Sequence, residues 1–144
     1  MANLGLYAPS GFYGKERDVI VLASTTFAVA NTNNFSSVIH VPSYARGFLL
    51  GINVTAISGV SAAVTVTGFW ASPIDLTRVA MTPAVASAAL IATGLVTLLV
   101  YPGLTAVANS VFSGVAGSIQ QWQFFVSNTT TPSVTLGCSL SWLA

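Results

Sequence analysis

The stretch SVTLGCSLSW, residues 133–142, alternates without interruption between two kinds of side chain. The apolar set is Val134, Leu136, Cys138, Leu140 and Trp142, and the small or polar set is Ser133, Thr135, Gly137, Ser139 and Ser141. A period of two places successive side chains on opposite faces of a β-strand. Because the second set contains no charge, we predict a strand with one face in a core and the other on an uncharged surface.

Three upstream segments, residues 46–57, 63–70 and 119–127, show the same period. Their predicted core faces are, in that order, Phe48, Leu50, Ile52 and Val54, then Val64, Val66, Gly68 and Trp70, then Trp122, Phe124 and Val126. The opposite faces are mainly polar and uncharged, although Leu49 and Phe69 are apolar there. A Ser-Gly turn follows residue 57, so we predict that the first two segments pair as a hairpin.

The rest of the chain is also predicted to form strands and their connections. Further strands are expected at residues 19–29, 36–41 and 95–101, and connections at 31–34, 73–82 and 104–117. Residues 84–92 fit either a short helix or a strand, because alanine favours helices and the run has no clear period. Seven or eight short strands predict one all-β domain, residues 19–144, built as an antiparallel β-sandwich of jelly-roll type.

Residues 1–18 differ in composition and predict an extended N-terminal arm. Glycine and proline interrupt its apolar residues, and it ends in Lys-Glu-Arg-Asp, a run whose charges cancel. Such a run is typical of a solvated turn. The alternative is an arm that reaches a neighbouring subunit through aromatic anchors. The candidate protein-contact residues are then Tyr7, Phe12, Tyr13, Lys15 and Arg17.

The charge content indicates association with other protein surfaces. Only 5% of the residues are charged and 53% are hydrophobic, whereas an average soluble domain has about 25% charged residues. A net charge of +1 excludes an electrostatic nucleic-acid binder, and the apolar content excludes a disordered chain. Few charges are left to oppose contacts between sheets. We therefore expect copies of the chain, or a larger assembly, to cover much of its surface.

The residues that usually carry catalysis are scarce. The chain has one histidine, one cysteine and three acidic residues. His40 is the only imidazole that could act as a base, and it lies between two apolar residues of a predicted strand. Cys138 lies on a predicted core face, where a buried and inert thiol is expected. This set supplies no ordinary zinc site, so we expect no enzyme, cofactor, metal or small-molecule substrate.

One uncharged, largely apolar stretch is a candidate membrane span. Residues 79–101 are long enough to cross a hydrocarbon core of about 30 Å. However, Pro83 and Gly94 interrupt the stretch, and no lysine or arginine follows it to set a topology. The N-terminus lacks a basic region followed by an apolar one, as in a signal peptide. We therefore expect no membrane insertion, and synthesis in a cytoplasm.

Several short sequence segments resemble those of small virion structural proteins of tailed bacteriophages. They are Ala45-Arg46-Gly47, Val54-Thr55-Ala56-Ile57-Ser58-Gly59, Ile91-Ala92-Thr93-Gly94, Val100-Tyr101-Pro102-Gly103-Leu104 and Pro132-Ser133-Val134-Thr135. The resemblance spans roughly residues 45–142 and does not include the arm. After Gly68 the chain reads Phe69-Trp70-Ala71-Ser72, where the family pattern leads us to expect charged residues.

The resemblance implies a β-rich protein present in many copies on a phage particle. Among such roles a capsid decoration, or cement, protein fits the small uncharged domain and its arm best. Its partners would then be the major capsid protein and copies of itself. Because such proteins often sit on three-fold positions, the resemblance implies a homotrimer. It would be made in the host cytoplasm and located in the virion. The alternatives are a tail or neck component, or a glycan-binding module at a fibre tip with Trp70 or Trp122 exposed.

Overall fold

The computed structural model describes residues 18–127 and 131–144, and within them it contains ten β-strands and no helix. The strands are β1 (Asp18–Phe27), β2 (Thr32–Phe35), β3 (Ile39–His40), β4 (Gly47–Ser58), β5 (Ala63–Ala71), β6 (Arg78–Ala80), β7 (Gly94–Val100), β8 (Val111–Phe112), β9 (Ile119–Ser127) and β10 (Ser133–Leu143). Asp18, expected to end the arm, is instead the first residue of β1 and lies opposite Ser141 of β10.

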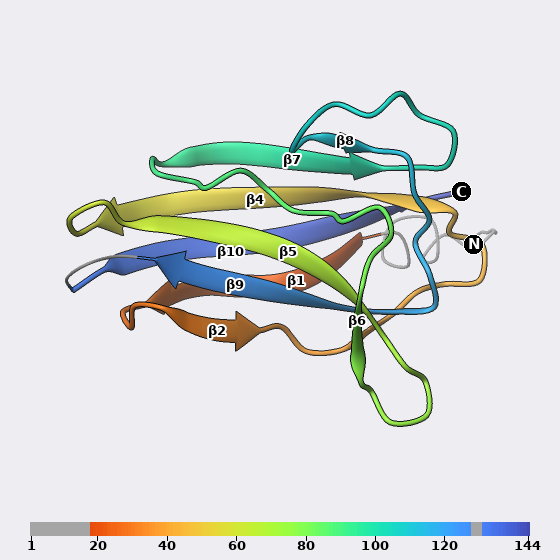
Figure 1. The fold of residues 1–144 in the computed structure, drawn as a ribbon, viewed down its shortest axis with the longest axis horizontal. Helices are drawn as coiled ribbons and strands as arrows, with labels where there is room; N and C mark the ends of the chain where they lie inside the picture. The colour runs from red at the N-terminus through yellow and green to blue at the C-terminus, as the bar shows by residue number, and fades with distance from the viewer. Residues whose placement is uncertain (1–17, 128–130) are drawn as a thin grey trace, which may run out of the picture.

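The strands form two sheets, which are packed into a sandwich (Figure 1). The first sheet has the order β1-β10-β4-β7-β8, and the second has the order β2-β9-β5-β6 with β3 also paired to β9. Without the two-residue strands β3 and β8, eight strands remain. When these eight are numbered along the chain, one sheet (β1, β10, β4, β7) has the order 1-8-3-6. The other sheet (β2, β9, β5, β6) has the order 2-7-4-5. This order is that of a jelly roll, so the predicted fold class is confirmed.

The predicted hairpin between residues 46–57 and 63–70 is wrong. β4 pairs with β10 and β7, whereas β5 pairs with β9 and β6 in the other sheet. The connection between them contains Gly59 and Ser61, both at positive φ, and it carries the chain from one sheet to the other. Each strand has one buried face, and two such faces can either share a sheet or oppose each other across a core. Alternation alone does not distinguish these arrangements.

Residues 84–92 form neither a helix nor a regular strand. Ala86 makes a single bridge to Thr67 of β5, and Leu90 makes another to Val64. Val85 and Leu90 are buried, so this extended segment continues along the edge of β5 beyond β6. It covers much of that edge, which reduces the backbone available for pairing with another chain.

The core lies between the two sheets and contains the predicted apolar faces. The largest fully buried side chains are Trp122, Trp142, Phe48, Phe124, Leu50, Ile52, Leu98, Leu136, Leu140, Gln120, Val54 and Val64. The amide of Gln120 is satisfied, because its Nε2 donates to the Ala116 carbonyl at 2.8 Å and its Oε1 accepts from Trp122 Nε1 at 3.2 Å. Within the described residues no helix is long and apolar enough to span a membrane.

Candidate interaction surfaces

The outer face of the first sheet is almost free of charge. On β4 it presents Leu49, Gly51, Asn53 and Thr55, the residues that alternate with its buried side chains. Asp18 is the only charged residue in any strand of this sheet, and it lies at the start of the edge strand β1. Its carboxylate accepts a hydrogen bond from the Ser141 hydroxyl. The face is therefore a broad surface of small, polar and aliphatic groups.

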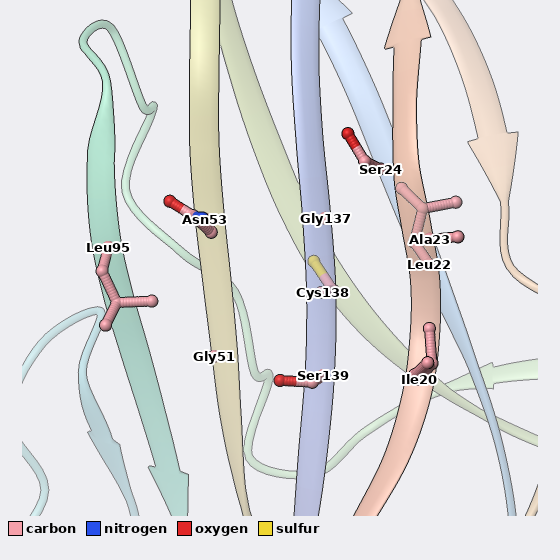
Figure 2. A pocket seen from close by; sticks show the side chains of 10 residues that line it. All are labelled: Ile20, Leu22, Ala23, Ser24, Gly51, Asn53, Leu95, Gly137, Cys138 and Ser139. Carbon is pink, nitrogen blue, oxygen red and sulfur yellow. The ribbon is translucent and has the colours of Figure 1, made fainter.

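A hollow of about 290 Å³ lies in this face (Figure 2). Its lining comes from four neighbouring strands and comprises Ile20, Leu22, Ala23, Ser24, Gly51, Asn53, Leu95, Gly137, Cys138 and Ser139. Figure 2 shows Ile20 of β1 on one side and Leu95 of β7 on the other, with β10 and β4 between them. Ile20 is 74% exposed and Leu95 is 69% exposed. Two exposed aliphatic side chains therefore border the hollow on opposite sides.

The floor is low because small residues meet there from two strands. In the ladder between β10 and β4, Ser139 lies opposite Gly51 and Gly137 lies opposite Asn53. The two glycines are therefore diagonal neighbours, and no side chain covers the backbone at either position. We call this part of the sheet, made of Gly51, Gly137 and Ser139, the hollow floor.

The glycines of the hollow floor are not required by the packing of the chain itself. A Cβ on Gly51 would lie 3.7 Å from Ser139 Oγ, and a Cβ on Gly137 would lie 3.5 Å from the Leu22 carbonyl oxygen; both are ordinary contacts. A Cβ on Gly47 would instead lie 2.2 Å from the Val100 carbonyl oxygen, and one on Gly68 would lie 2.8 Å from the Trp122 ring. The fold needs the second pair of glycines, but it tolerates a side chain in place of the first pair.

Cys138 lies in the hollow lining but is only 4% exposed. Burial raises the pKa of its thiol to about 12, because a thiolate would lose its hydration there. The thiol therefore stays protonated at neutral pH, and the prediction of a buried cysteine is confirmed.

The outer face of the second sheet carries an aromatic cluster that sequence analysis missed. The Arg78 guanidinium lies 3.8 Å from the centre of the Phe35 ring, and the Phe35 and Phe69 rings meet edge to face at 6.3 Å. Arg78 Nη1 also donates to Gln121 Oε1 at 3.2 Å, and Gln121 Nε2 donates to the Ser36 carbonyl at 2.8 Å. The apolar Phe69 on a polar strand face was the available signal. The two outer faces thus differ, since the strands of the second sheet include a cation, Arg78, and those of the first sheet do not.

The predicted contact residues of the arm, Tyr7, Phe12, Tyr13, Lys15 and Arg17, lie outside the described residues. Their predicted role therefore stays a prediction.

The glycan-binding alternative expected an exposed tryptophan. Trp122 is fully buried, and its indole donates to Gln120. Trp70 is half-buried, and its pyrrole edge lies against Gly117, where an added Cβ would come within 2.7 Å of Nε1. Trp142 is buried as well. None of the three tryptophans in the chain stands on an exposed face as a ring for stacking on a sugar.

His40 is an exposed residue of β3 and lies opposite Ile119 of β9. Across residues 18–127 and 131–144, no group of three or more His, Cys, Asp and Glu side chains is placed to hold a metal ion. Asp75 lies in the exposed loop before β6, where a hydrogen bond from the Thr77 backbone N–H lowers the pKa of its carboxyl.

Comparison with known proteins gives a weak structural similarity to a viral protein chain. No family model matches the sequence, and no curated protein matches it significantly. A chain in a solved structure of infectious bursal disease virus, Gx strain, aligns with a TM-score of 0.49 and 11% sequence identity. The alignment covers 85% of the present chain and 30% of the viral chain. The chain thus spans under a third of that viral chain.

Proposed function

We propose that the chain is a virion structural protein and that it decorates an assembled phage head. The observation that carries this proposal is the outer face of the first sheet, whose strands contain one charged residue, Asp18. Such a face has few charges to oppose association, so we expect another protein surface to cover it permanently. Jelly rolls occur in viral capsid proteins among other classes, which is compatible with this role. The proposed role includes no catalysis and no cofactor.

The proposed mechanism is stabilisation by mass action. A protein that binds the assembled shell, but not its dissociated parts, favours the assembled state. At a free concentration of 100 times the dissociation constant, one such site contributes about 2.7 kcal/mol. Bridging of adjacent capsomers makes local opening of the shell more costly, and many copies add avidity. The proposed partners are the major capsid protein and two further copies of the chain in a trimer.

The proposed arm contacts neighbouring subunits through its aromatic residues Tyr7, Phe12 and Tyr13, with Lys15 and Arg17 beside them. Tyrosine and arginine are enriched in protein interfaces, where each offers both apolar and hydrogen-bonding surface.

Co-sedimentation with undecorated phage heads tests the decoration role. The proposal predicts saturable binding with a fixed number of copies per head, and heads that resist heat better when decorated. Protein that stays in the supernatant at all concentrations would overturn the decoration role. Recovery with purified tails in the same experiment would instead assign the chain to the tail or neck.

A further inference from the structure

We propose that the hollow in the outer face of the first sheet is the docking site for residues 4–13 of a neighbouring copy. This inference rests on the self-association in the proposed function, but it does not depend on binding to a shell. It assigns an acceptor surface to the arm, whose own contact residues were inferred from sequence alone.

The hollow floor indicates what kind of group approaches it. Glycine inside a strand weakens the strand, and it often marks a place where another backbone or a ligand comes close. Gly51 and Gly137 would both accept a Cβ at ordinary contact distances, so the fold of a single chain does not explain them. Side chains at these positions would fill the hollow. The two glycines therefore favour an occupant that lays its backbone against the sheet.

The rim of the hollow indicates the chemistry of the occupant. Ile20 and Leu95 are 74% and 69% exposed, and no charged residue lines the hollow. A volume of about 290 Å³ is just below the range for ligand sites, which begins at about 300 Å³. This volume suits one or two apolar side chains on an extended segment. It does not suit a charged ligand, which would lose hydration without gaining a partner of opposite charge.

Residues 1–17 contain a segment with this chemistry. Residues 1–14 have no charged side chain, and within them Leu4, Leu6, Tyr7, Phe12 and Tyr13 are apolar or aromatic. All the charges before β1 lie at residues 15–17. The glycines and the proline in this stretch disfavour a helix, so a narrow extended backbone is available to lie on the hollow floor.

Reach and direction favour the hollow of another copy. The chain enters β1 at Asp18, two residues before Ile20 at the rim of its own hollow. To return there, the chain would have to reverse within residues 14–17. Residues 1–17 can span up to about 60 Å when extended, whereas the 12-residue β4 is about 40 Å long. Their length is therefore sufficient to reach a neighbouring copy.

The face of the sheet is a better acceptor than its edge. β1 is the edge strand, and its pairing with β10 shows register shifts between Ile20 and Leu22 and between Leu22 and Thr25. Such irregularities twist an edge and interrupt the row of backbone groups that another strand would use. The hollow floor, in contrast, lies on an uninterrupted part of the β10–β4 ladder, between Leu136 and Leu143.

Disulfide trapping in the full-length chain tests the site. Tyr7→Cys in one chain and Leu95→Cys in another are mixed and oxidised mildly, and cross-linked dimers are measured on a non-reducing gel. The control pair is Tyr7→Cys with Val60→Cys, because Val60 is 62% exposed but does not line the hollow. The unsubstituted chain reports any background from Cys138. We expect dimers from the Leu95 pair at about tenfold the yield of the control pair.

Equal yields from the two pairs would overturn the site. A chain that carries both Tyr7→Cys and Leu95→Cys, and that cross-links only within itself, would overturn the docking between copies.

A charge placed on the hollow floor gives a second test. Ser139→Arg should raise the dissociation constant of the oligomer by about tenfold or more, because the guanidinium would fill the hollow and be buried without a partner of opposite charge. Thr55→Arg is the matched control, since Thr55 is exposed on the same face of β4 and outside the lining. The same loss in both variants, or in neither, would contradict the proposal. Circular dichroism of each variant checks that it is folded.

Binding to heads separates this inference from the proposed function. If trapping fails while the unsubstituted chain still saturates heads, the docking site is wrong and the decoration role stands. If trapping succeeds while no head is bound, the docking site stands and the decoration role is wrong.

Discussion

Phe48 of β4 and Trp122 of β9 meet edge to face across the sandwich, with ring centroids 5.7 Å apart and ring planes at 81°. The two strands belong to different sheets, so this contact joins the two halves of the core. Both side chains are fully buried, and Phe48 also meets the Trp142 ring at 6.3 Å. The core of the jelly roll is thus centred on aromatic rings from three strands.

Trp122→Ala should lower the free energy of unfolding by about 3–5 kcal/mol, because it removes this contact and leaves a cavity. Urea unfolding followed by circular dichroism measures the change. Phe125→Ala on the same strand is the control, since Phe125 is only half-buried on the opposite face. Equal losses in the two variants would contradict the assignment of faces on β9.

Gly51 of β4 and Gly68 of β5 should respond differently to alanine. Gly68→Ala should cost about 1–3 kcal/mol, because its Cβ would meet Trp122 at 2.8 Å and Met81 Sδ at 2.9 Å. Gly51→Ala should leave stability unchanged or raise it by about 0.4–1 kcal/mol, since the site is open and glycine is the more flexible residue when unfolded. Thermal unfolding compares the two. A loss of stability in Gly51→Ala as large as that in Gly68→Ala would show that the hollow floor has no room for a Cβ at Gly51.

Cys138 should resist alkylation in the folded protein at pH 8 and react once the protein is unfolded in urea. Its pKa is raised from 9.0 to about 12, so the unfolded thiol loses its proton first as the pH rises. Unfolding is then favoured, and this group should lower stability progressively above about pH 9 and have no effect below it. Comparison with Cys138→Ala isolates the effect. The same dependence of stability on pH in both proteins above pH 9 would contradict the burial of the thiol.

Arg78 and Phe35 should be energetically coupled. A guanidinium over an aromatic ring at an exposed site contributes about 0.5–1 kcal/mol, and the observed distance to the ring centre is 3.8 Å. A double-mutant cycle with Arg78→Ala and Phe35→Leu measures the coupling apart from the Gln121 hydrogen bond of Arg78. Additive effects of the two substitutions would show that the ring contact contributes nothing in solution.

The strands with unbroken alternation were predictable from sequence. Residues 133–142 and 119–127 are β10 and β9 nearly to the residue, because one face of each is buried and the other is not. The pairing of strands within each sheet was harder to predict from the sequence. β4 and β5 are adjacent in sequence and each has a buried face, yet they oppose each other across the core. The local pattern shows which face of a strand is buried, but it does not show to which sheet the strand belongs.

The hollow could not be predicted, because it depends on lateral neighbours. Gly51 and Gly137 are far apart in sequence, and they become diagonal neighbours only through the register of β4 with β10. Ile20 joins the rim through the pairing of β1 with β10. The sequence did indicate an uncharged outer face, which is the property on which the proposed function depends.

Sedimentation equilibrium of the full-length chain over micromolar concentrations tests the central claim most directly. An uncharged outer sheet face with a hollow beside exposed Ile20 and Leu95 predicts a stable oligomer, with a mass that is a fixed multiple of the single chain. A single-chain mass at every concentration would contradict the claim that other copies cover this face.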